Sequence, residues 1–315
     1  MMSQEKQTPA RPEPAIPFGE PVTADGQMTP AQLRALQLKS LELALYFKDF
    51  CQRNNLLFYF CGGCCIGAVR HGGFIPWDDD VDVFMPREDY EKMKRLWNQQ
   101  ADTARYVLEC SDEHKVNHEL FVTIRDAETT FIKPYQTHLD MCHGVLLDIL
   151  PLDGYPSSKM KRRMQVFWAL LYSLYCSQVV PEKHGGSMRV LSKIALGMVP
   201  SKKMRYRIWK MAERKMTRYR IEDCDSITEL CAGPGYMKNR YPKSAFQSAV
   251  YKDFEGEQMP LPVGYDDYLR IAFGDYMQLP PKEKQVAHHD AVLIDLDHSY
   301  KTYKGKYYCT TGADK

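Results

Sequence analysis

The first long stretch of regularly spaced apolar residues predicts an amphipathic helix. Residues three, four and seven positions apart share one face of a helix. The apolar positions follow these intervals at Leu33, Leu36, Leu43, Phe47 and Phe50. Thr29 and Pro30 precede them, and this pair is typical of a helix start because the hydroxyl can cap the first turn and proline presets φ. We therefore expect a helix that begins at residue 30 and ends at Asn54.

Short apolar or alternating runs after this helix predict a set of strands. They cover residues 56–61, 80–85, 106–109, 120–125, 130–133 and 144–150. Between the first two strands, Gly62 and Gly63 break the pattern and a short helix is expected over residues 64–70. A further helix is expected from residue 86 toward Trp97. The last strand has the strongest apolar pattern, and we expect Pro151 and Gly154 to mark its exit.

The two ends of this region differ from it in composition. Residues 1–30 contain six prolines and almost no apolar residues, so residues 1–29, before the helix start at Pro30, are expected to form a disordered, proline-rich extension. Residues 157–222 have a helical pattern throughout, which prolines and glycines divide into about three helices. Residues 223–295 return to short mixed elements, and 296–315 form a tail.

Charge is balanced over the whole chain but not within it. Lys and Arg number 42 against 40 Asp and Glu, so no global charge favours nucleic acid. The segment 157–222 carries 16 basic and 3 acidic residues, an excess of +13 that leaves −11 for the remainder. Its uncharged run 164–180 is shorter and more polar than the ~20 apolar residues of a transmembrane helix. The segment therefore suits peripheral contact with an anionic membrane surface, or a structural helical layer with a solvated basic face.

The cysteines and the N-terminus indicate the cellular compartment of the protein. The chain has ten cysteines, a number that suggests a disulfide scaffold only in a short secreted protein. The first residues lack the basic start and apolar run of a secretory signal. We therefore expect reduced cysteines and a cytoplasmic protein, with peripheral contact at the inner face of the cell membrane as an option.

The candidate catalytic motif is a Gly-Gly pair followed by an Asp-x-Asp strand. Side chains alternate along a strand, so Asp80 and Asp82 should point to the same side, about 7 Å apart. Two such carboxylates repel each other unless a cation lies between them, and Mg²⁺ (or Mn²⁺) with its preference for oxygen ligands is the expected ion. Gly62 and Gly63 before a helix N-terminus allow a phosphate to approach backbone N–H groups. This combination predicts a phosphoryl-transfer site.

A third carboxylate should complete this site. Asp148 lies within an otherwise apolar strand, where burial is costly without a function. It can hold a second metal ion or accept the proton of an attacking hydroxyl, and Asp78 is a further candidate ligand. Taken singly, Gly-Gly is a common turn and the acidic run a common loop. Strand, Gly-Gly, helix and Asp-x-Asp strand in this order are typical of the nucleotidyltransferase superfamily.

Several other side chains are candidates for the donor phosphates and the nucleotide. Arg suits bidentate phosphate contact, and an aromatic ring can stack on a base or enclose a quaternary ammonium. Each candidate also has a structural interpretation: a solvated helix end, a dipole partner, a core residue or a salt-bridge partner. The candidates are Cys64, Arg70, His71, Trp77, Arg87 and Arg125.

Two long motifs resemble those of the LicD-type phosphocholine transferases, a family related to fukutin-related protein. The first contains Gly62-Gly63, IGAVRHGGFIPWDDDVDV at 66–83 and PREDY at 86–90. The second contains PVGYDDYL at 262–269, FGDYM at 273–277 and LPPKEKQ at 279–285. The resemblance covers roughly residues 40 to 290. It implies an α+β fold with a nucleotidyltransferase-like mixed β-sheet core flanked by helices, to which the basic helical segment is an addition.

The resemblance also implies an activity. It implies metal-dependent transfer of a phospho-alcohol, phosphocholine from CDP-choline in the commonest assignment, to a sugar hydroxyl of a cell-envelope glycan or teichoic-acid precursor, with release of CMP. The acceptor can be lipid-linked. Alternatives are another CDP-alcohol such as CDP-ribitol, a nucleotidyltransferase that releases pyrophosphate, and an inactive membrane-surface or glycan-binding module. Residues 30–156 are the expected catalytic core, and 223–295 the C-terminal part of the same domain.

One position departs from the family pattern. Family members commonly have Thr after Gly-Gly, whereas this chain has Cys64, and a thiol is a weaker hydrogen-bond donor than a hydroxyl. Position 64 therefore offers a phosphate either its side chain or only its backbone N–H. Together with Cys61 and Cys65, it also resembles half of a zinc site, although no second cluster follows at the usual spacing. Small buried thiols are the alternative interpretation.

Overall fold

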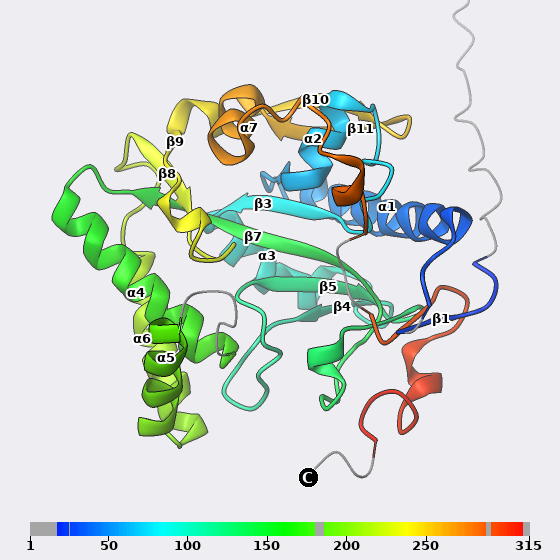
Figure 1. The fold of residues 1–315 in the computed structure, drawn as a ribbon. Coiled ribbons are helices and arrows are strands. Elements are labelled where there is room, and N and C mark those ends of the chain that lie inside the picture. Colours follow the sequence, from blue (N-terminus) through cyan, green and yellow to red (C-terminus); the bar gives the residue numbers. More distant parts are fainter. Residues whose placement is uncertain (1–17, 25, 180–185, 288–290, 311–315) are drawn as a thin grey trace, which may run out of the picture.

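A mixed β-sheet forms the centre of the fold, which we describe from a computed structural model (Figure 1). The structure describes residues 18–24, 26–179, 186–287 and 291–310. Five strands follow one another in the sheet, and two more extend it from its longest strand. In spatial order these are β2 (Tyr59–Phe60), β3 (Asp82–Pro86), β7 (Val145–Tyr155), β5 (Val122–Asp126) and β4 (Tyr106–Glu109), with β8 (Ser226–Glu229) and β9 (Tyr241–Pro242) as the extension.

Strand β7 is the longest strand of the sheet and connects its parts. It pairs in parallel with β3 and antiparallel with β5 and β8. The pairing with β5 ends at Ile149, and the pairing with β8 begins at Leu152. Pro151 lies between the part of β7 that pairs with β5 and the part that pairs with β8. Because neither antiparallel pairing needs a hydrogen-bond donor at this position, the missing N–H of proline is tolerated.

The strand does not end at Pro151 and Gly154 as predicted. Gly154 remains in β7 and pairs with Ile227 of β8. A Cβ at this position would come within 2.5 Å of the carbonyl oxygen of Tyr219, and the Gly154 N–H donates to that same oxygen at 3.2 Å. The glycine is therefore needed for the close approach of another backbone segment, not for a turn.

Two helices cover one face of the sheet. Helix α1 (Pro30–Arg53) begins with Thr29 as its capping residue, as predicted, and α3 (Arg87–Gln100) follows β3 directly. Both lie behind the strands in Figure 1 and pack against β7. The strand residues that face them, Val83, Leu147 and Ile149, belong to the main hydrophobic core. Because side chains alternate along a strand, Asp82 and Asp148 point to the opposite face.

A second group of elements lies above the sheet in Figure 1. It consists of helix α2 (Gly62–Arg70), the hairpin of β10 (Ala249–Phe254) and β11 (Glu257–Pro262), and helix α7 (Tyr265–Phe273). Phe254, Tyr268 and Leu269 bury their side chains in the same core as β2 and β3. The C-terminal motif therefore packs directly against the Gly-Gly region.

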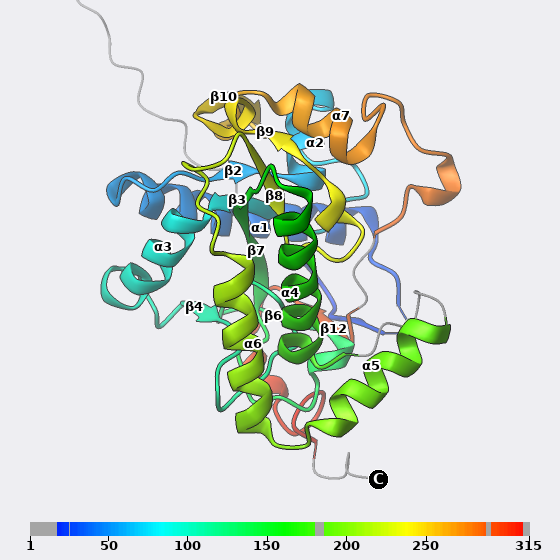
Figure 2. The same cartoon turned by 90° about the vertical axis from the view of Figure 1, so that its left-hand side faces the viewer.

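The basic segment forms three helices, as its pattern predicted. They are α4 (Lys159–Ser177), α5 (Gly186–Met198) and α6 (Lys202–Met216). Figure 2 shows α4 and α6 side by side with α5 running away from them. They share a separate core that includes Tyr172, Trp209 and Met216. Among the described helices, none is long and apolar enough to cross a membrane.

A small sheet joins segments from the two ends of the described chain. Strand β12 (Leu293–Asp295) lies between β1 (Val22–Thr23) and β6 (Thr130–Ile132). We expected residues 1–29 to be disordered, and β1 lies within that range. Residues 1–17 lie outside the described part of the chain. The expected tail packs as well, because Tyr308 is buried against β6.

The fold class agrees with the prediction at the level of a mixed sheet flanked by helices with an additional basic helical segment. All ten cysteines are free thiols, as expected for reduced cysteines. Among the described residues, the only group of three side chains close enough to share a metal ion consists of aspartates. Cys61, Cys64 and Cys65 therefore do not form a zinc cluster with described neighbours.

Candidate active site

A cavity of about 640 Å³ lies on the face of the sheet opposite α1 and α3. Its walls come from β3, β7, the loop before β5, the end of α4, the segment after β8, and α7. The charged residues that line it are Asp80, Asp82, Glu119, Lys133, Asp148 and Glu229, and the aromatic ones are Phe84, Phe121, Tyr135, Tyr236, Tyr268 and Phe273. A cavity with this mixture suits a ligand that has both charged and apolar groups.

The three carboxylates predicted to act together all line this cavity. Asp82 and Asp148 are direct partners in the parallel register of β3 and β7. Asp80 lies two residues before Asp82, the first residue of β3. The residue between them also pairs with β7, because the Asp148 N–H donates to the Val81 carbonyl at 3.1 Å. Strand alternation therefore brings Asp80 and Asp82 to the same side, although the regular strand begins at Asp82 and not at Asp80 as predicted.

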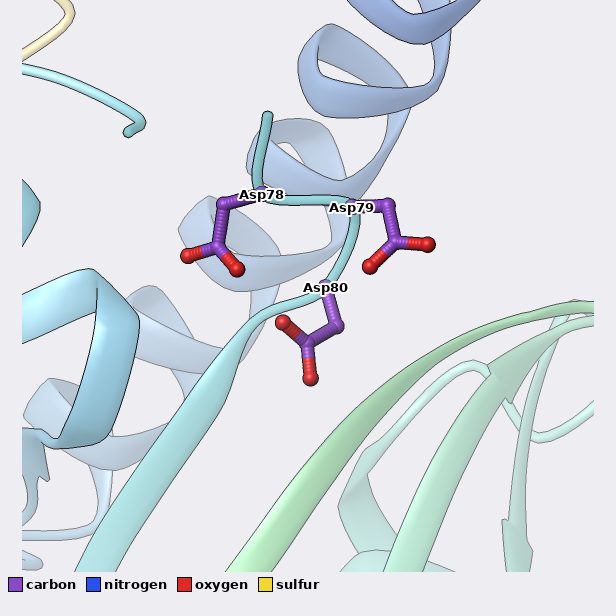
Figure 3. Close-up of side chains that lie close together, drawn as sticks. All are labelled: Asp78, Asp79 and Asp80. Carbon is purple, nitrogen blue, oxygen red and sulfur yellow. The ribbon is translucent and has the colours of Figure 1, made fainter. Parts of the chain in front are cut away.

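The aspartates before β3 form a tight group (Figure 3). One carboxylate oxygen each of Asp78, Asp79 and Asp80 lies within 4.8 Å of the others. Figure 3 shows the side chains of Asp78 and Asp79 on opposite sides of the backbone, as expected from their alternation. Asp79 is buried and lines a small second cavity with Leu36 and Ser40 of α1. Asp78 therefore remains the better candidate to add charge to the site.

The glycine pair brings helix α2 close to these carboxylates. Gly62 has φ +52°, a conformation that favours glycine, and a Cβ there would lie 3.9 Å from the Asp82 carboxylate, an ordinary contact. A Cβ at Gly63 would overlap the Asp78 carboxylate. The N–H of Gly62 donates to the hydroxyl of Tyr268 at 2.9 Å. Tyr268 of the C-terminal motif therefore holds the start of α2, which the sequence could not show.

The side chain of Cys64 is engaged within the fold. Its thiol donates to the carbonyl of Asp80 at 3.6 Å, and burial raises the pKa of this thiol well above its usual value. Cys64 is not among the residues that line the cavity. The thiol is therefore used within the fold, and a contact of the Cys64 backbone N–H with a phosphate stays a prediction.

Lys133 is the buried cation of the cavity. Its ammonium nitrogen lies 3.1 Å from Oε1 of Glu119 and 3.8 Å from Oδ2 of Asp148. The three side chains are at most 12% exposed. The hydroxyl of Tyr135 donates to the same Glu119 oxygen at 2.5 Å. One ammonium is thus shared by two carboxylates, one of which is a predicted site residue.

The protonation of this group follows from its burial. Burial alone would lower the pKa of Lys133, but Asp148 and Glu119 outweigh it and raise the pKa above its usual value. Burial raises the pKa of Asp148 to about 6, against the opposing charge of Lys133. A carboxylate with a pKa close to neutrality is matched to proton transfer. Lys133 therefore stays charged while Asp148 can exchange a proton near pH 6.

The other predicted phosphate and nucleotide ligands are placed away from the cavity lining. Two arginines are held by the fold: Arg70 donates to the carbonyl of Tyr276 at 2.6 Å, and Arg87 forms a bidentate pair with Asp153 at 2.7 and 2.9 Å. The buried Arg125 donates to Gln136 at 3.0 Å. Of the remaining two, His71 is exposed and Trp77 packs partly against the main core. The three arginines have partners within the fold, and contact of these five residues with a donor stays a prediction.

Sequence reasoning missed three charged residues of the cavity. Glu119, Lys133 and Glu229 come from three separate segments, and none belongs to a motif. The only local signal was at Lys133, a cation at the end of the apolar run Thr130–Ile132. A lysine is almost never fully buried unless it is paired, so a lysine adjoining a buried strand would have suggested a carboxylate partner without identifying it.

Glu229 should make the stability of the protein depend on pH. Burial raises its pKa to about 7, although Tyr241 and Asn239 donate hydrogen bonds to its carboxylate. Its favourable contribution is therefore complete below the unfolded pKa of about 4.5 and is lost as the pH rises through about 7. When the pH is raised from 5 to 8, we expect the melting temperature of Glu229→Gln to fall by less than that of the unmodified chain. Thermal melts should show no such change for Glu283→Gln, and equal pH slopes for all three proteins would contradict the assignment.

The residues on the cavity wall fit a divalent metal ion. Asp80, Asp82 and Asp148 offer only oxygen atoms, which Mg²⁺ and Mn²⁺ prefer. Oδ1 of Asp148 is buried and finds no hydrogen-bond partner among the described residues. Buried carboxylate oxygens rarely remain unsatisfied in proteins. The described carboxylates whose oxygen atoms already lie within 4.8 Å of one another are those of Asp78, Asp79 and Asp80, and a cation beside Asp148 would satisfy its buried oxygen.

Comparisons with known proteins agree with the two motifs. Residues 55–168 match the model described as LicD/FKTN/FKRP, nucleotidyltransferase domain. The chain is 29% identical over 270 residues to the lipopolysaccharide cholinephosphotransferase LicD of Haemophilus influenzae, across 82% of this chain and 96% of that protein. It is 36% identical over 131 residues to the mouse ribitol 5-phosphate transferase FKRP, across 41% of this chain and 24% of that protein.

The matched range and the geometry coincide. Residues 55–168 contain the glycine pair, β3, Lys133 and β7, and thus most of the charged wall of the cavity. The alignment with the bacterial protein extends this similarity well beyond that range. Residues 55–168 are thus similar to the nucleotidyltransferase domain of the LicD/FKTN/FKRP family, which confirms the resemblance recognised from the motifs.

Proposed function

We propose that this protein transfers phosphocholine from CDP-choline to a sugar hydroxyl of a cell-envelope glycan or teichoic-acid precursor and releases CMP. The observation that carries the proposal is the juxtaposition of Asp80, Asp82 and Asp148 on one cavity, within a chain that is similar to a cholinephosphotransferase. The nucleotidyltransferase-like character of the sheet is part of the same proposal. The reaction would take place in the cytoplasm.

In this proposal the carboxylates hold Mg²⁺ or Mn²⁺. Asp80 and Asp82 are the first ligands, Asp148 is adjacent to them in register, and Asp78 adds negative charge nearby. The ion would neutralise the diphosphate of the donor and the charge that develops on the departing CMP.

The protein's own groups supply binding, orientation and proton transfer. Backbone N–H groups at the start of α2 beyond Gly62 can face the donor phosphates. Asp148 accepts the proton of the acceptor hydroxyl, and Lys133 fixes the position of its carboxylate through the contact at 3.8 Å. The aromatic side chains of the same cavity provide an apolar wall for the alcohol and the base.

Ribitol phosphate is the second candidate group. Besides the mouse protein, the human ribitol 5-phosphate transferase FKRP is 28% identical to this chain over 125 residues. In this proposal the same three carboxylates serve either donor. The two candidates differ in the alcohol and not in the transfer chemistry.

Incubation with a panel of CDP-alcohols and Mg²⁺ or Mn²⁺ tests the proposal. We expect CMP release by slow hydrolysis, fastest with CDP-choline and strictly dependent on the metal ion. Preferential use of CDP-ribitol would support the second candidate. Release of pyrophosphate from CTP would identify a nucleotidyltransferase instead, and the absence of metal-dependent nucleotide binding would indicate an inactive binding module.

Asp148→Asn distinguishes proton transfer from metal binding. If Asp148 acts on the acceptor hydroxyl, turnover should fall by about 10²–10⁴-fold, the usual contribution of a general base. Donor affinity, measured by calorimetry with a CDP-alcohol and Mg²⁺, should change only severalfold. An outright loss of donor binding would show instead that Asp148 is a metal ligand and that the base lies elsewhere.

A further inference from the structure

We propose that helix α5 docks the protein on an anionic phospholipid bilayer. Four apolar side chains of this helix, Val190, Leu191, Ile194 and Met198, are between 54% and 77% exposed. With 3.6 residues per turn they fall within an arc of roughly 100° on one side of the helix. They therefore form a continuous apolar strip that faces away from the rest of the described protein.

The opposite side of α5 provides the attachment to the fold. Ser192 and Leu196 are buried, and the carbonyl of Ala195 accepts a hydrogen bond from the hydroxyl of Tyr175 in α4 at 2.9 Å. Arg205 of α6 donates to the carbonyl of Leu196 at 2.9 Å. The helix is thus held through one face while it presents a second apolar face that the core does not use.

The charges around the strip match an anionic surface. Helix α5 contains no acidic residue, and Arg189 and Lys193 are exposed on it. Lys202, Lys203 and Arg207 are exposed on the adjoining helix α6. An amphipathic helix with basic flanks lies in the plane of a bilayer, with its apolar side in the acyl boundary. Each basic residue near such a surface strengthens binding about fivefold.

Helix α4 shows the same combination of residues. Met160, Met164 and Phe167 are spaced three and four residues apart and are between 45% and 67% exposed. Lys159, Lys161 and Arg163 are exposed next to them. Exposed apolar side chains flanked by basic ones are typical of helices that lie on an anionic bilayer. The occupant that we propose for this surface is therefore phospholipid, and a protein partner is one of the outcomes that the test separates.

Vesicle sedimentation tests this proposal without reference to catalysis. The full chain should sediment with vesicles of phosphatidylglycerol and phosphatidylcholine at low salt, and should be released at high salt. It should remain in solution with vesicles of phosphatidylcholine alone. The double variant Leu191→Glu and Ile194→Glu should lose at least about tenfold in vesicle affinity, and the pair Lys202→Gln and Lys203→Gln about 25-fold.

Three controls decide the interpretation. Tyr251→Glu changes an equally exposed apolar residue of β10 and should bind as the unmodified chain does. Asp80→Asn should also bind normally, which separates docking from the proposed chemistry, and thermal melts should show all variants folded. Equal binding to both vesicle types, no binding at low salt, or equal loss in Tyr251→Glu would each overturn the proposal. So would a dimer in solution that the α5 variant dissociates without any vesicle binding.

Discussion

Asp80→Asn and Asp82→Asn are each expected to lower CMP release by at least about a hundredfold while leaving the fold intact. Both side chains line the cavity beside Asp148. Each change removes a charge with almost no change of volume. A metal ion that polarises a phosphate supplies several kcal/mol of transition-state stabilisation, and about 1.4 kcal/mol corresponds to a tenfold change in rate.

Steady-state CMP release and thermal melts on the purified variants measure this effect. Asp253→Asn is a matched control because that aspartate is exposed on β10, outside the cavity lining. It should retain the full rate. If Asp80→Asn and Asp82→Asn both kept more than about a tenth of the rate, the assignment of the metal ligands would be wrong.

The parts of the fold that were predictable depend on local patterns. The Thr29-Pro30 pair specified the start of α1, and the capping hydrogen bond from Gln32 to Thr29 is present. Period-two alternation in Asp80–Met85 correctly placed the two carboxylates on one side. The isolated polar residue in the apolar run 145–150 identified Asp148. In each case neighbouring residues alone determine the outcome, so the sequence carries the information.

The parts that were not predictable depend on contacts between distant segments. Gly154 was expected to mark the exit of the strand because its actual neighbour, the Tyr219 carbonyl, is 65 positions away in the chain. Arg87 was considered both as a phosphate ligand and as a salt-bridge partner, and the anion that it contacts in the fold is Asp153 of β7. A local pattern shows that an arginine needs an anion but does not show which anion is closest.

The same limitation explains the charged wall of the cavity. Glu119 lies in the loop before β5 and Glu229 ends β8, and neither lies in a run that predicts a buried carboxylate. The pairing of β12 with β1 and β6 also joins segments more than 150 residues apart. These features arise when the sheet assembles, so they require the structure.

Lys133→Met is expected to cause the largest loss of stability among these variants. Removal of the ammonium leaves the buried carboxylates of Glu119 and Asp148 without their shared cation. Breaking a buried ion pair in this way costs about 3–5 kcal/mol. Chemical denaturation in the absence of divalent ions measures the free energy of unfolding. Lys39→Met, which removes a more exposed lysine paired with Glu42 in α1, should cost at most about 1 kcal/mol.

The pH dependence and a double variant identify the cause of that loss. Burial already raises the pKa of Asp148 to about 6, and without Lys133 it should rise further. A raised pKa favours the folded state at low pH and is unfavourable as the pH increases through it, so the deficit of Lys133→Met should be larger at pH 8 than at pH 5. The variant Lys133→Met with Asp148→Asn removes both charges and should recover a substantial part of the lost stability. A deficit that is independent of pH and unchanged in the double variant would mean that Lys133 contributes through the packing of its methylene chain and not through its charge.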